Sequence, residues 1–556
     1  MLVNQKLFHP LFIALFLLLL CLLLNYSALM GNWRWDDSSV LLHLFQYSLV
    51  DDFIKAEVWR EFSRTNLMPW MVLSYQVDLH LFGLKPNLFY IHHLFALTAS
   101  SMALCYLLSL WVRKPFAVLG AGLFLLSTPS LVVAQQLMTR HYIEGLLFCL
   151  LALIFFVKFL RKESKRYLVM SVIFYTLSVT AKEIYVPLVV LLPFLPESNI
   201  RSRLVATLPF VMVVSVYIIW RNHMLGTLTG GYTQSDIFLT AAFIPEVLQS
   251  FTNFPALLYP TNWVLFSLAF ISLLAVYCYL SRSKLMLSSL VLLLILLPLI
   301  PLVRSPGIVG ADRYLFLLAT AISFSIAYYA DAVVGTHLQQ RPKLKMLCLT
   351  IVFPVFVFVS FSSGMETRKG LLRSTAEYDV QADFIWNNNA SVAFEPSQSL
   401  KASYWFVSDL IDFKQRLLVG ETAAVAVPDG LFLLDSIESL YVYDHSCECM
   451  QDISGQLSDR RNQFSASLNT TAPLSVEFQY SENGFSWQFG PYQEGMYSIV
   501  SNVLGVAVIP SSGRVSSSVK NGASMYVRYE SPQGWVTYSD ELRVVHNGPA
   551  VSWSRR

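Results

Sequence analysis

Two adjacent carboxylates follow directly after the first long apolar segment of the chain. Asp36 and Asp37 lie within residues 32–38, behind two tryptophans and before a run of polar residues. Paired carboxylates can take a proton from an attacking hydroxyl group, or hold a divalent metal that activates it. The pair could instead cap the next helix beside an interfacial tryptophan belt, because aspartate is favoured at that position. The rest of the chain has to distinguish these roles.

A second set of residues with useful chemistry is basic. Arginine and lysine hold phosphate oxygens by charge and hydrogen bonds, and they stabilise a leaving group whose negative charge is growing. Each basic side chain could equally extend toward lipid headgroups at a membrane surface. The candidates for an anion-binding site are Arg140, Lys182, Arg221, Arg304 and Arg313.

Two histidines and one acid are further candidates. His92 and His93 stand near the start of an apolar segment, where either could contact a substrate or a metal, or simply pack at the interface. Glu183 follows Lys182 directly and could pair with it. These residues are therefore open to a structural interpretation as well as a functional one.

Composition indicates the elements that must position these side chains. The chain of 556 residues is 55% hydrophobic and 13% charged, which is more apolar than a soluble fold of this size. Its net charge of +3 gives no field that would attract nucleic acid. A bilayer requires about 20 apolar residues per helix, and about eleven such segments occur. They cover about 7–30, 88–112, 115–134, 142–160, 167–181, 184–196, 203–220, 262–281, 285–303, 313–334 and 346–362.

The connections between these segments alternate in basic content. Arginine and lysine gather on every second connection, which the positive-inside rule places in the cytoplasm. The other connections then face outward, and the first of them, residues 31–87, is long and rich in aromatic residues. An odd number of spans also exports residues 363–556. The chain is therefore predicted to have a transmembrane domain over 1–362 and an extracytoplasmic domain over 363–556.

The exported segment has a different pattern. Short alternating stretches at 474–480, 485–489, 525–529 and 535–538 are typical of strands separated by turns. We expect a β-rich domain, with a β-sandwich as the leading arrangement, behind a helical stretch at 370–390. Cys447 and Cys449 lack the spacing of a zinc module, so a disulfide or free thiols are expected there.

Four motifs occur in an order that resembles a known family, the GT-C glycosyltransferases. The resemblance covers about residues 7–335 and is strongest to the protein O-mannosyltransferases and to the transmembrane O-mannosyltransferases with tetratricopeptide repeats. The C-terminal domain is not a tetratricopeptide array, because it lacks a 34-residue helical period. The motifs are the acidic pair after the first helix, Leu81–Pro86 with Tyr90 and His92–His93, Thr180–Glu183, and Asp312–Phe316.

This resemblance implies a GT-C-like membrane enzyme. Such an enzyme moves a hexose or pentose from a polyprenyl-phosphate donor to a glycan, lipid or protein acceptor, with inversion of the anomeric centre. The resemblance also implies that Asp36 or Asp37 is the base or the ligand of a divalent metal, Mg²⁺ or Mn²⁺. It favours Lys182 and Arg313 as the residues that bind the donor phosphate. Where the family has Tyr-Arg-Pro, this chain has Leu67-Met68-Pro69, so the basic contact expected there is either missing or supplied by Arg64. Further substrate contacts are expected at Glu183, Tyr314, His92, His93 and Arg64.

Two other classes of protein share part of this pattern. An O-antigen-type polymerase or ligase of lipid-linked glycans also combines many helices with a large outer loop, although its loop usually falls late in the chain. The other class is non-enzymatic, a transporter or a scaffold that displays a β-sandwich. Transport requires ionisable groups or broken helices near the middle of the bilayer, whereas the charges here gather at helix ends. The outward side is the bacterial periplasm or its eukaryotic equivalent, the lumen of the endoplasmic reticulum. The short N-terminus and short cytoplasmic connections favour a bacterial inner membrane, with residues 31–87 and the C-terminal domain in the periplasm.

Overall fold

The structure is a computed structural model of the 556-residue chain. It describes residues 9–63, 65–227, 255–280, 284–296, 311–334, 351–418, 422–434, 437–481, 484–515, 524–547 and 550–555. The chain forms two compact units, each assembled from two stretches of sequence. Residues 1–31 and 47–373 form what we call the membrane unit, and residues 32–46 and 374–556 form the C-terminal unit.

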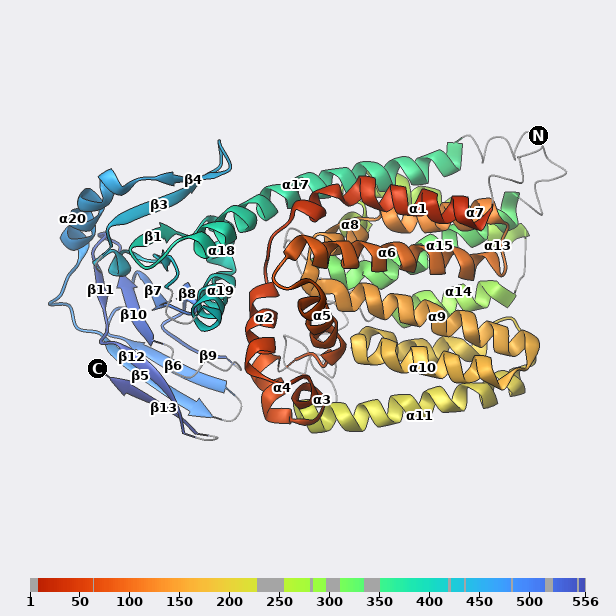
Figure 1. Cartoon of the computed structure of the whole chain (residues 1–556), viewed down its shortest axis with the longest axis horizontal. Coiled ribbons are helices and arrows are strands. Elements are labelled where there is room, and N and C mark those ends of the chain that lie inside the picture. The colour runs from red at the N-terminus through yellow and green to blue at the C-terminus, as the bar shows by residue number, and fades with distance from the viewer. Residues whose placement is uncertain are drawn as a thin grey trace. The chain divides into compact units, whose positions relative to one another are not determined.

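Apolar helices build the membrane unit (Figure 1). Five helical segments of the described residues are long and apolar enough to cross a bilayer, and each covers a segment predicted to span it. They contain α1 (Pro10–Asn25), α6 (Pro86–Ser109), α9 (Arg140–Lys162), α11 (Ile200–Leu225) and α15 (Phe316–Ala332). These helices are those expected of a polytopic integral membrane protein.

A bent pair of helices accounts for a sixth predicted span. Helices α7 (Lys114–Leu126) and α8 (Thr128–Ala134) meet at 58°. Between them Ser127 has extended backbone angles, and Pro129 lies in the first turn of α8. Proline tolerates that position but cannot continue a helix that precedes it. The apolar segment predicted over 115–134 is therefore present as two helices with a bend between them, which together count as one candidate span.

The remaining apolar helices of this unit are shorter or irregular. The segment predicted at 184–196 is a 3-10 helix, η4 (Glu183–Phe194), which contains two prolines. Each proline removes a backbone donor, so a regular α-helix cannot form through it. The others are α10 (Lys165–Ala181), α13 (Trp263–Leu280), α14 (Lys284–Leu296) and the start of α17 (Phe353–Asn387). A total of eleven spans stays a prediction.

The first predicted outer loop is helical and divides between the two units. Helix α2 (Asp37–Gln46) belongs to the C-terminal unit. Helices α3 (Leu49–Ile54), α4 (Ala56–Phe62) and α5 (Pro69–Phe82) belong to the membrane unit. In α4, Trp59 is completely buried, and its indole N–H donates to the carbonyl oxygen of Asn66 at 2.9 Å. Trp59 therefore packs as core, whereas Phe45 of the same loop is exposed.

The first layer of the C-terminal unit was not predicted. It is a mixed sheet in the order β2-β1-β3-β4, in which β1 runs parallel to both β2 and β3. Its elements are β1 (Val392–Glu395), β2 (Val425–Ala426), β3 (Ser439–Asp444) and β4 (Cys449–Asp452), with α18 (Gln398–Ala402), α19 (Tyr404–Leu417) and α20 (Leu457–Ser467). This layer is not part of the expected β-sandwich, because its parallel strands are joined by helical crossovers.

The predicted strands lie in the second layer. Three strands form the sheet β5-β6-β9, and a larger sheet has the order β13-β12-β10-β7-β8 with β11 beside β10. Val476 and Phe489 belong to the β5-β6-β9 sheet. They share a hydrophobic cluster with Tyr497, Val527 and Tyr529 of the larger sheet, so these two sheets pack face to face. The strands are β5 (Ser475–Ser481), β6 (Gly484–Gly490), β7 (Met496–Ser501), β8 (Gly505–Ile509), β9 (Ser512–Val515), β10 (Ser524–Glu530), β11 (Val536–Tyr538), β12 (Leu542–Asn547) and β13 (Ala550–Arg555).

A disulfide joins Cys447 and Cys449 at the turn between β3 and β4. This confirms one of the two states expected for these cysteines. The bond lies in an exposed part of the C-terminal unit.

Candidate active site

Three of the predicted cations come together in the membrane unit. Lys182 ends α10, Arg221 lies in the last turns of α11, and Arg313 lies just before α15. Lys182 is buried, and this burial, with the positive charges of Arg313 and Arg221, lowers its pKa to about 7. We call these three residues the cationic cluster. Like charges held this close together favour a nearby anion, and Glu183 already forms an ion pair with Arg221.

Aromatic rings frame this cluster. The Lys182 Nζ lies 5.2 Å from the centroid of the Tyr142 ring, and the Arg313 guanidinium lies 5.4 Å from that of Tyr314. The two tyrosine rings are 6.4 Å apart, edge to face. Cations over aromatic faces retain their charge at low cost in hydration. The structure therefore places Tyr314, a predicted substrate contact, at the cluster.

The segment 65–68 of the first loop is bound to the same cluster. Lys182 Nζ lies 3.3 Å from the Asn66 side-chain oxygen, and Arg221 Nη2 donates to the Thr65 carbonyl at 3.2 Å. The carboxylate of Glu183 accepts the Leu67 backbone N–H at 2.7 Å and also forms an ion pair with Arg221. The sequence suggests Lys182 as the partner of Glu183, whereas the structure pairs Glu183 with Arg221. Residue 64 lies outside the described residues, as does Arg304, so both predicted contacts stay predictions.

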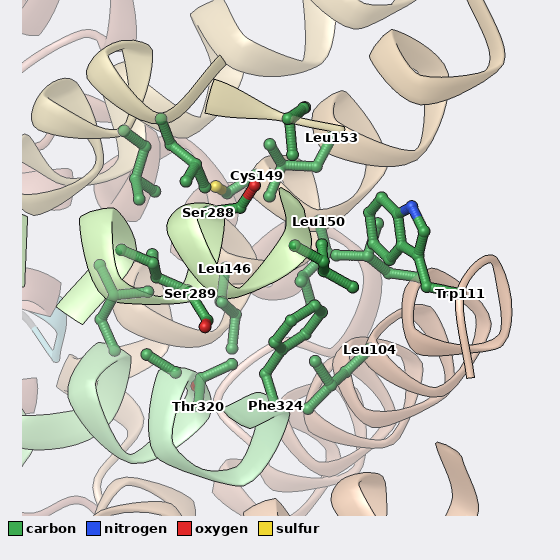
Figure 2. Close-up of a pocket in the computed structure, with 18 residues that line it drawn as sticks. Leu104, Trp111, Leu146, Cys149, Leu150, Leu153, Ser288, Ser289, Thr320 and Phe324 are labelled. Atoms are coloured by element: carbon green, nitrogen blue, oxygen red, sulfur yellow. The ribbon is translucent and has the colours of Figure 1, made fainter. Parts of the chain in front are cut away.

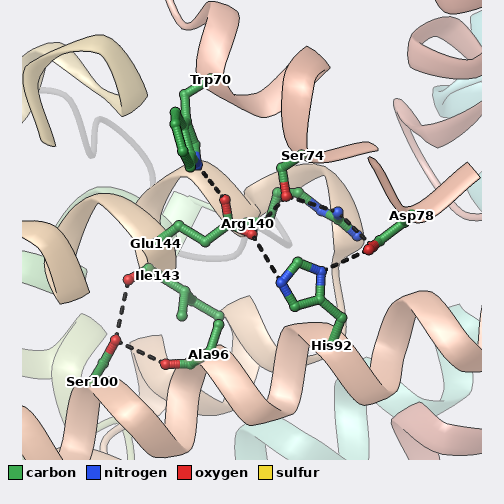
Figure 3. A network of polar contacts seen from close by, with 9 residues as sticks. All are labelled: Trp70, Ser74, Asp78, His92, Ala96, Ser100, Arg140, Ile143 and Glu144. Atoms are coloured by element: carbon green, nitrogen blue, oxygen red, sulfur yellow. Dashed lines mark hydrogen bonds and ion pairs between the residues drawn. The ribbon is translucent and has the colours of Figure 1, made fainter. Parts of the chain in front are cut away.

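Arg140 belongs to a separate network of buried polar groups (Figure 3). Its Nη1 donates to Asp78 Oδ2 at 2.7 Å and to Ser74 Oγ at 3.1 Å. Its guanidinium carbon lies 4.1 Å from the centroid of the Tyr75 ring. Arg140 is fully buried, so the carboxylate of Asp78 compensates its charge. The predicted phosphate contact at Arg140 therefore has to compete with an existing buried ion pair.

His92 and Glu144 complete this network. The imidazole Nδ1 of His92 lies 2.8 Å from Asp78 Oδ1, and its Nε2 lies 3.9 Å from Glu144 Oε1 (Figure 3). Ser74 Oγ and Trp70 Nε1 donate to the two oxygens of Glu144, at 2.7 and 2.5 Å. His93, in contrast, is buried, and its Nε2 lies 2.8 Å from the Val133 carbonyl oxygen. Of the two predicted histidines, His92 is the one that lies beside carboxylates.

Sequence reasoning missed Asp78 and Glu144. The signal was present, because each is a lone acid inside an apolar helix, where ionisable residues are rare and usually paired. Asp78 follows Ser74 by four residues on α5, and Glu144 follows Arg140 by four on α9. Residues spaced by four share a helix face, so the two pairs can meet across the helices.

The acidic pair is held within the C-terminal unit. Asp37 is completely buried, and its Oδ2 accepts the Arg34 backbone N–H at 2.8 Å. Asp36 precedes α2, and its Oδ1 accepts the Trp405 indole N–H at 2.8 Å. The predicted acids and the predicted cations therefore belong to different compact units. Among the described residues, no group of three or more His, Cys, Asp or Glu is arranged to hold a metal, so Mg²⁺ or Mn²⁺ at Asp36 or Asp37 stays a prediction.

The membrane unit contains an apolar cavity. It is partly open, lies between α6, α9, η4, α14 and α15, and has a lining that is mostly leucine (Figure 2). Leu146 follows Tyr142 by one turn of α9, and Leu317 follows Arg313 by about one turn. The cavity therefore begins about one helical turn from the cations and contributes almost no polar groups besides serine and threonine hydroxyls.

Comparisons with known proteins give little further information. No family model and no curated protein matches the chain. Among solved structures, the chain is similar to the oligosaccharyltransferase of Archaeoglobus fulgidus, crystallised with a tethered acceptor peptide that contains the NVT sequon. The TM-score is 0.41 at 10% sequence identity, and the match covers 71% of this chain and 62% of that one. A likeness this distant carries no argument about function. The helices define a class, a polytopic membrane protein with a β-rich C-terminal region.

Proposed function

We propose that this protein is a membrane glycosyltransferase of the GT-C type. It transfers a hexose or pentose from a polyprenyl-phosphate donor to a glycan, lipid or protein acceptor outside the cytoplasm. The observation that carries the proposal is the buried cationic cluster, together with an apolar cavity whose lining begins about one helical turn away. A lipid phosphate has the matching form, with an anionic group that needs fixed cations and a hydrocarbon chain that needs an apolar space.

The chemistry needs one displacement at the anomeric carbon. The acceptor hydroxyl attacks, the bond from that carbon to the phosphate oxygen breaks, and the polyprenyl phosphate leaves with its electron pair. Lys182, Arg221 and Arg313 stabilise the negative charge that grows on the phosphate. Asp36 or Asp37 takes the hydroxyl proton as base, or holds the metal if one is used. A single displacement inverts the anomeric centre.

The polar network around Arg140 favours one competing function. Buried acids with a half-exposed histidine inside a helical bundle are also found along the ion pathways of transporters. A transporter needs those groups for its activity but has no use for the acidic pair in the C-terminal unit. Loss of sugar transfer in acidic-pair variants therefore separates the two functions.

The cationic cluster can be tested by sugar transfer. The purified full-length protein is incubated with radiolabelled polyprenyl-phosphate sugars and cell-envelope acceptors, and label in the acceptor is counted. Lys182→Gln is expected to raise the donor KM about 10-fold, since a charged hydrogen bond contributes about 1.5–3 kcal/mol. Lys162→Gln is the matched control and should behave as wild type. Lys162 is the last residue of α9, whereas Tyr142, which contacts Lys182, lies in the first turn of that helix. Equal donor KM values for the two variants would remove the assigned role of the cluster.

The proposal also includes the topology. We place residues 31–87 and 363–556 in the periplasm of a bacterial inner membrane, with eleven spans in total. An impermeant thiol reagent applied to intact cells should label Ser48→Cys and spare Lys165→Cys, in a background without other free cysteines. Labelling of the second position alone would reverse the orientation and exclude a donor site on the outer face.

A further inference from the structure

The acidic turn, residues 32–37, is bound to α17 of the C-terminal unit. The Arg34 guanidinium forms a two-bond ion pair with Asp379, at 2.7 Å from Nε to Oδ1 and 2.6 Å from Nη2 to Oδ2. The Asn32 backbone N–H also donates to Asp379 Oδ1, at 3.0 Å, and its side-chain amide donates to Asp383 at 2.6 Å. Bidentate arginine–carboxylate pairs fix direction as well as distance. Asp379 therefore determines where the turn begins.

Helix α19 holds the other end of the turn and the start of α2. The Trp405 indole N–H donates to Asp36 Oδ1 at 2.8 Å. Ser38 Oγ donates to the Phe406 carbonyl at 3.1 Å, and the Ser39 hydroxyl donates to the Asp409 carboxylate. Trp405 is 42% exposed, so its ring is not a core element. Its indole N–H instead fixes one oxygen of a candidate catalytic carboxylate.

The backbone of the turn adopts a conformation that these contacts must maintain. Trp35 has a φ of 48°, in the left-handed region that a bulky residue rarely occupies. Its ring packs against Tyr378 of α17, with centroids 5.0 Å apart. Strained residues of this kind persist when surrounding contacts over-determine them, and they concentrate at functional sites. The strain lies immediately before Asp36, where an error in the turn would misdirect both carboxylates.

We propose that Asp379 and Trp405 are positioning residues for Asp36 and Asp37, so that the C-terminal unit is part of the catalytic machinery. This inference rests on the proposed function, because it requires the acidic pair to act in sugar transfer. Asp379 acts through Arg34 on the path of the backbone, and Trp405 acts directly on the orientation of the Asp36 carboxylate. Neither residue is required to touch the donor.

The test uses the purified full-length protein and the sugar-transfer assay. Trp405→Phe keeps an aromatic ring and removes the indole donor, and Trp487→Phe is its matched control, because Trp487 Nε1 donates to the Pro510 carbonyl elsewhere in the same unit. We expect Trp405→Phe to lower kcat about 10-fold with the donor KM within about twofold of wild type. Its pH profile should also move, since losing a donor to an ionised carboxylate raises the pKa of that carboxylate and shifts the acidic limb upward.

The second variant, Asp379→Asn, tests the α17 contact. It should lower kcat further, by about 100-fold, while Asp379→Glu retains the charge and recovers part of the rate. Asp412→Asn, which breaks an exposed ion pair with Arg416 on α19, should have the wild-type rate. Thermal unfolding of each variant identifies any that fail to fold. If an Asp379 variant does not fold, Trp405→Phe tests the positioning role, because it retains an aromatic ring.

The outcomes separate this inference from the proposed function. Loss of transfer in Asp36→Asn or Asp37→Asn, together with wild-type kcat and pH profile in Trp405→Phe, would overturn the positioning role alone. Wild-type transfer in both aspartate variants would overturn the proposed catalytic pair and with it this inference. A lower kcat with a shifted pH profile in Trp405→Phe and a normal Trp487→Phe would support it.

Discussion

The membrane unit and the C-terminal unit hold their charged groups by different means. In the membrane unit, the cations Lys182 and Arg313 lie against aromatic rings, and Arg221 is tied to a loop carbonyl and an acid. In the C-terminal unit, Asp36 and Asp37 are held by N–H donors on a strained turn. The first arrangement gathers three cations around aromatic rings, whereas the second fixes the direction of a carboxylate. Each half of the proposed chemistry can therefore be damaged without the other.

The largest expected effect comes from the acidic pair. Asp36→Asn or Asp37→Asn should lower kcat by about 10²- to 10⁴-fold, since general-base catalysis contributes that much. The donor should still bind, because the cationic cluster is untouched. Equilibrium binding of a labelled polyprenyl-phosphate sugar measures this, with Asp412→Asn as the control. Loss of donor binding in the aspartate variants would contradict this division of roles.

The next largest effect concerns the buried network of the membrane unit. Asp78→Asn leaves the Arg140 guanidinium without its carboxylate, which costs about 3–5 kcal/mol when a buried pair is broken. Unfolding in detergent should show this loss. Asp331→Asn breaks the more exposed pair with Arg113 and should cost no more than about 1 kcal/mol. Similar losses for the two variants would mean that the Arg140 network is not a buried stabilising element.

A smaller effect should appear as pH dependence at Lys182. Burial and the charges of Arg313 and Arg221 lower the pKa of Lys182 to about 7, so the side chain is charged below that pH and loses its proton above it. The donor kcat/KM, which reports groups of the free enzyme, should therefore fall as the pH rises through about 7. Lys182→Arg should remove this limb, because arginine stays protonated. A profile unchanged in the arginine variant would assign the limb to another group.

The smallest effect is expected at Asp383. Its pKa is raised by burial and by the neighbouring Asp379, so the folded protein favours its protonated form and loses stability as the pH rises through that pKa. Asp383→Asn should reduce this loss between mildly acidic and neutral pH, by no more than about 0.5 kcal/mol, because Asp383 is exposed and solvent screens its charge. Thermal unfolding at both pH values measures it. A larger pH dependence in the variant would contradict the direction of the shift.

Local patterns were sufficient to predict much of the fold. Apolar length predicted the helices around α1, α6, α9, α11 and α15, and alternating residues predicted strands such as β5 and β10. Two features escaped, for physical reasons. Strands β1 and β2 are four and two residues long, too short to show a period. The bend at Ser127 depends on one proline position that the apolar pattern conceals.

The site was predicted only in part. Lys182 and Arg313 were found because they stand in short motifs, and the structure brings them together with Arg221. The network of Asp78, Arg140 and Glu144 depends on contacts between helices, which a single sequence does not reveal. The bond between Arg34 and Asp379 joins residues 345 positions apart. No local pattern indicates such a pair, so the role of the C-terminal unit at the acidic turn became visible only in three dimensions.

The central claim is that a sugar leaves a lipid phosphate on this protein. It is tested most directly with a polyprenyl-phosphate sugar labelled in both the sugar and the lipid, supplied to the purified protein with envelope acceptors. We expect labelled polyprenyl phosphate to be released in step with sugar that enters the acceptor, and both to be lost in the double variant Asp36→Asn/Asp37→Asn. Release and transfer that continue in the double variant at the wild-type rate would contradict the account.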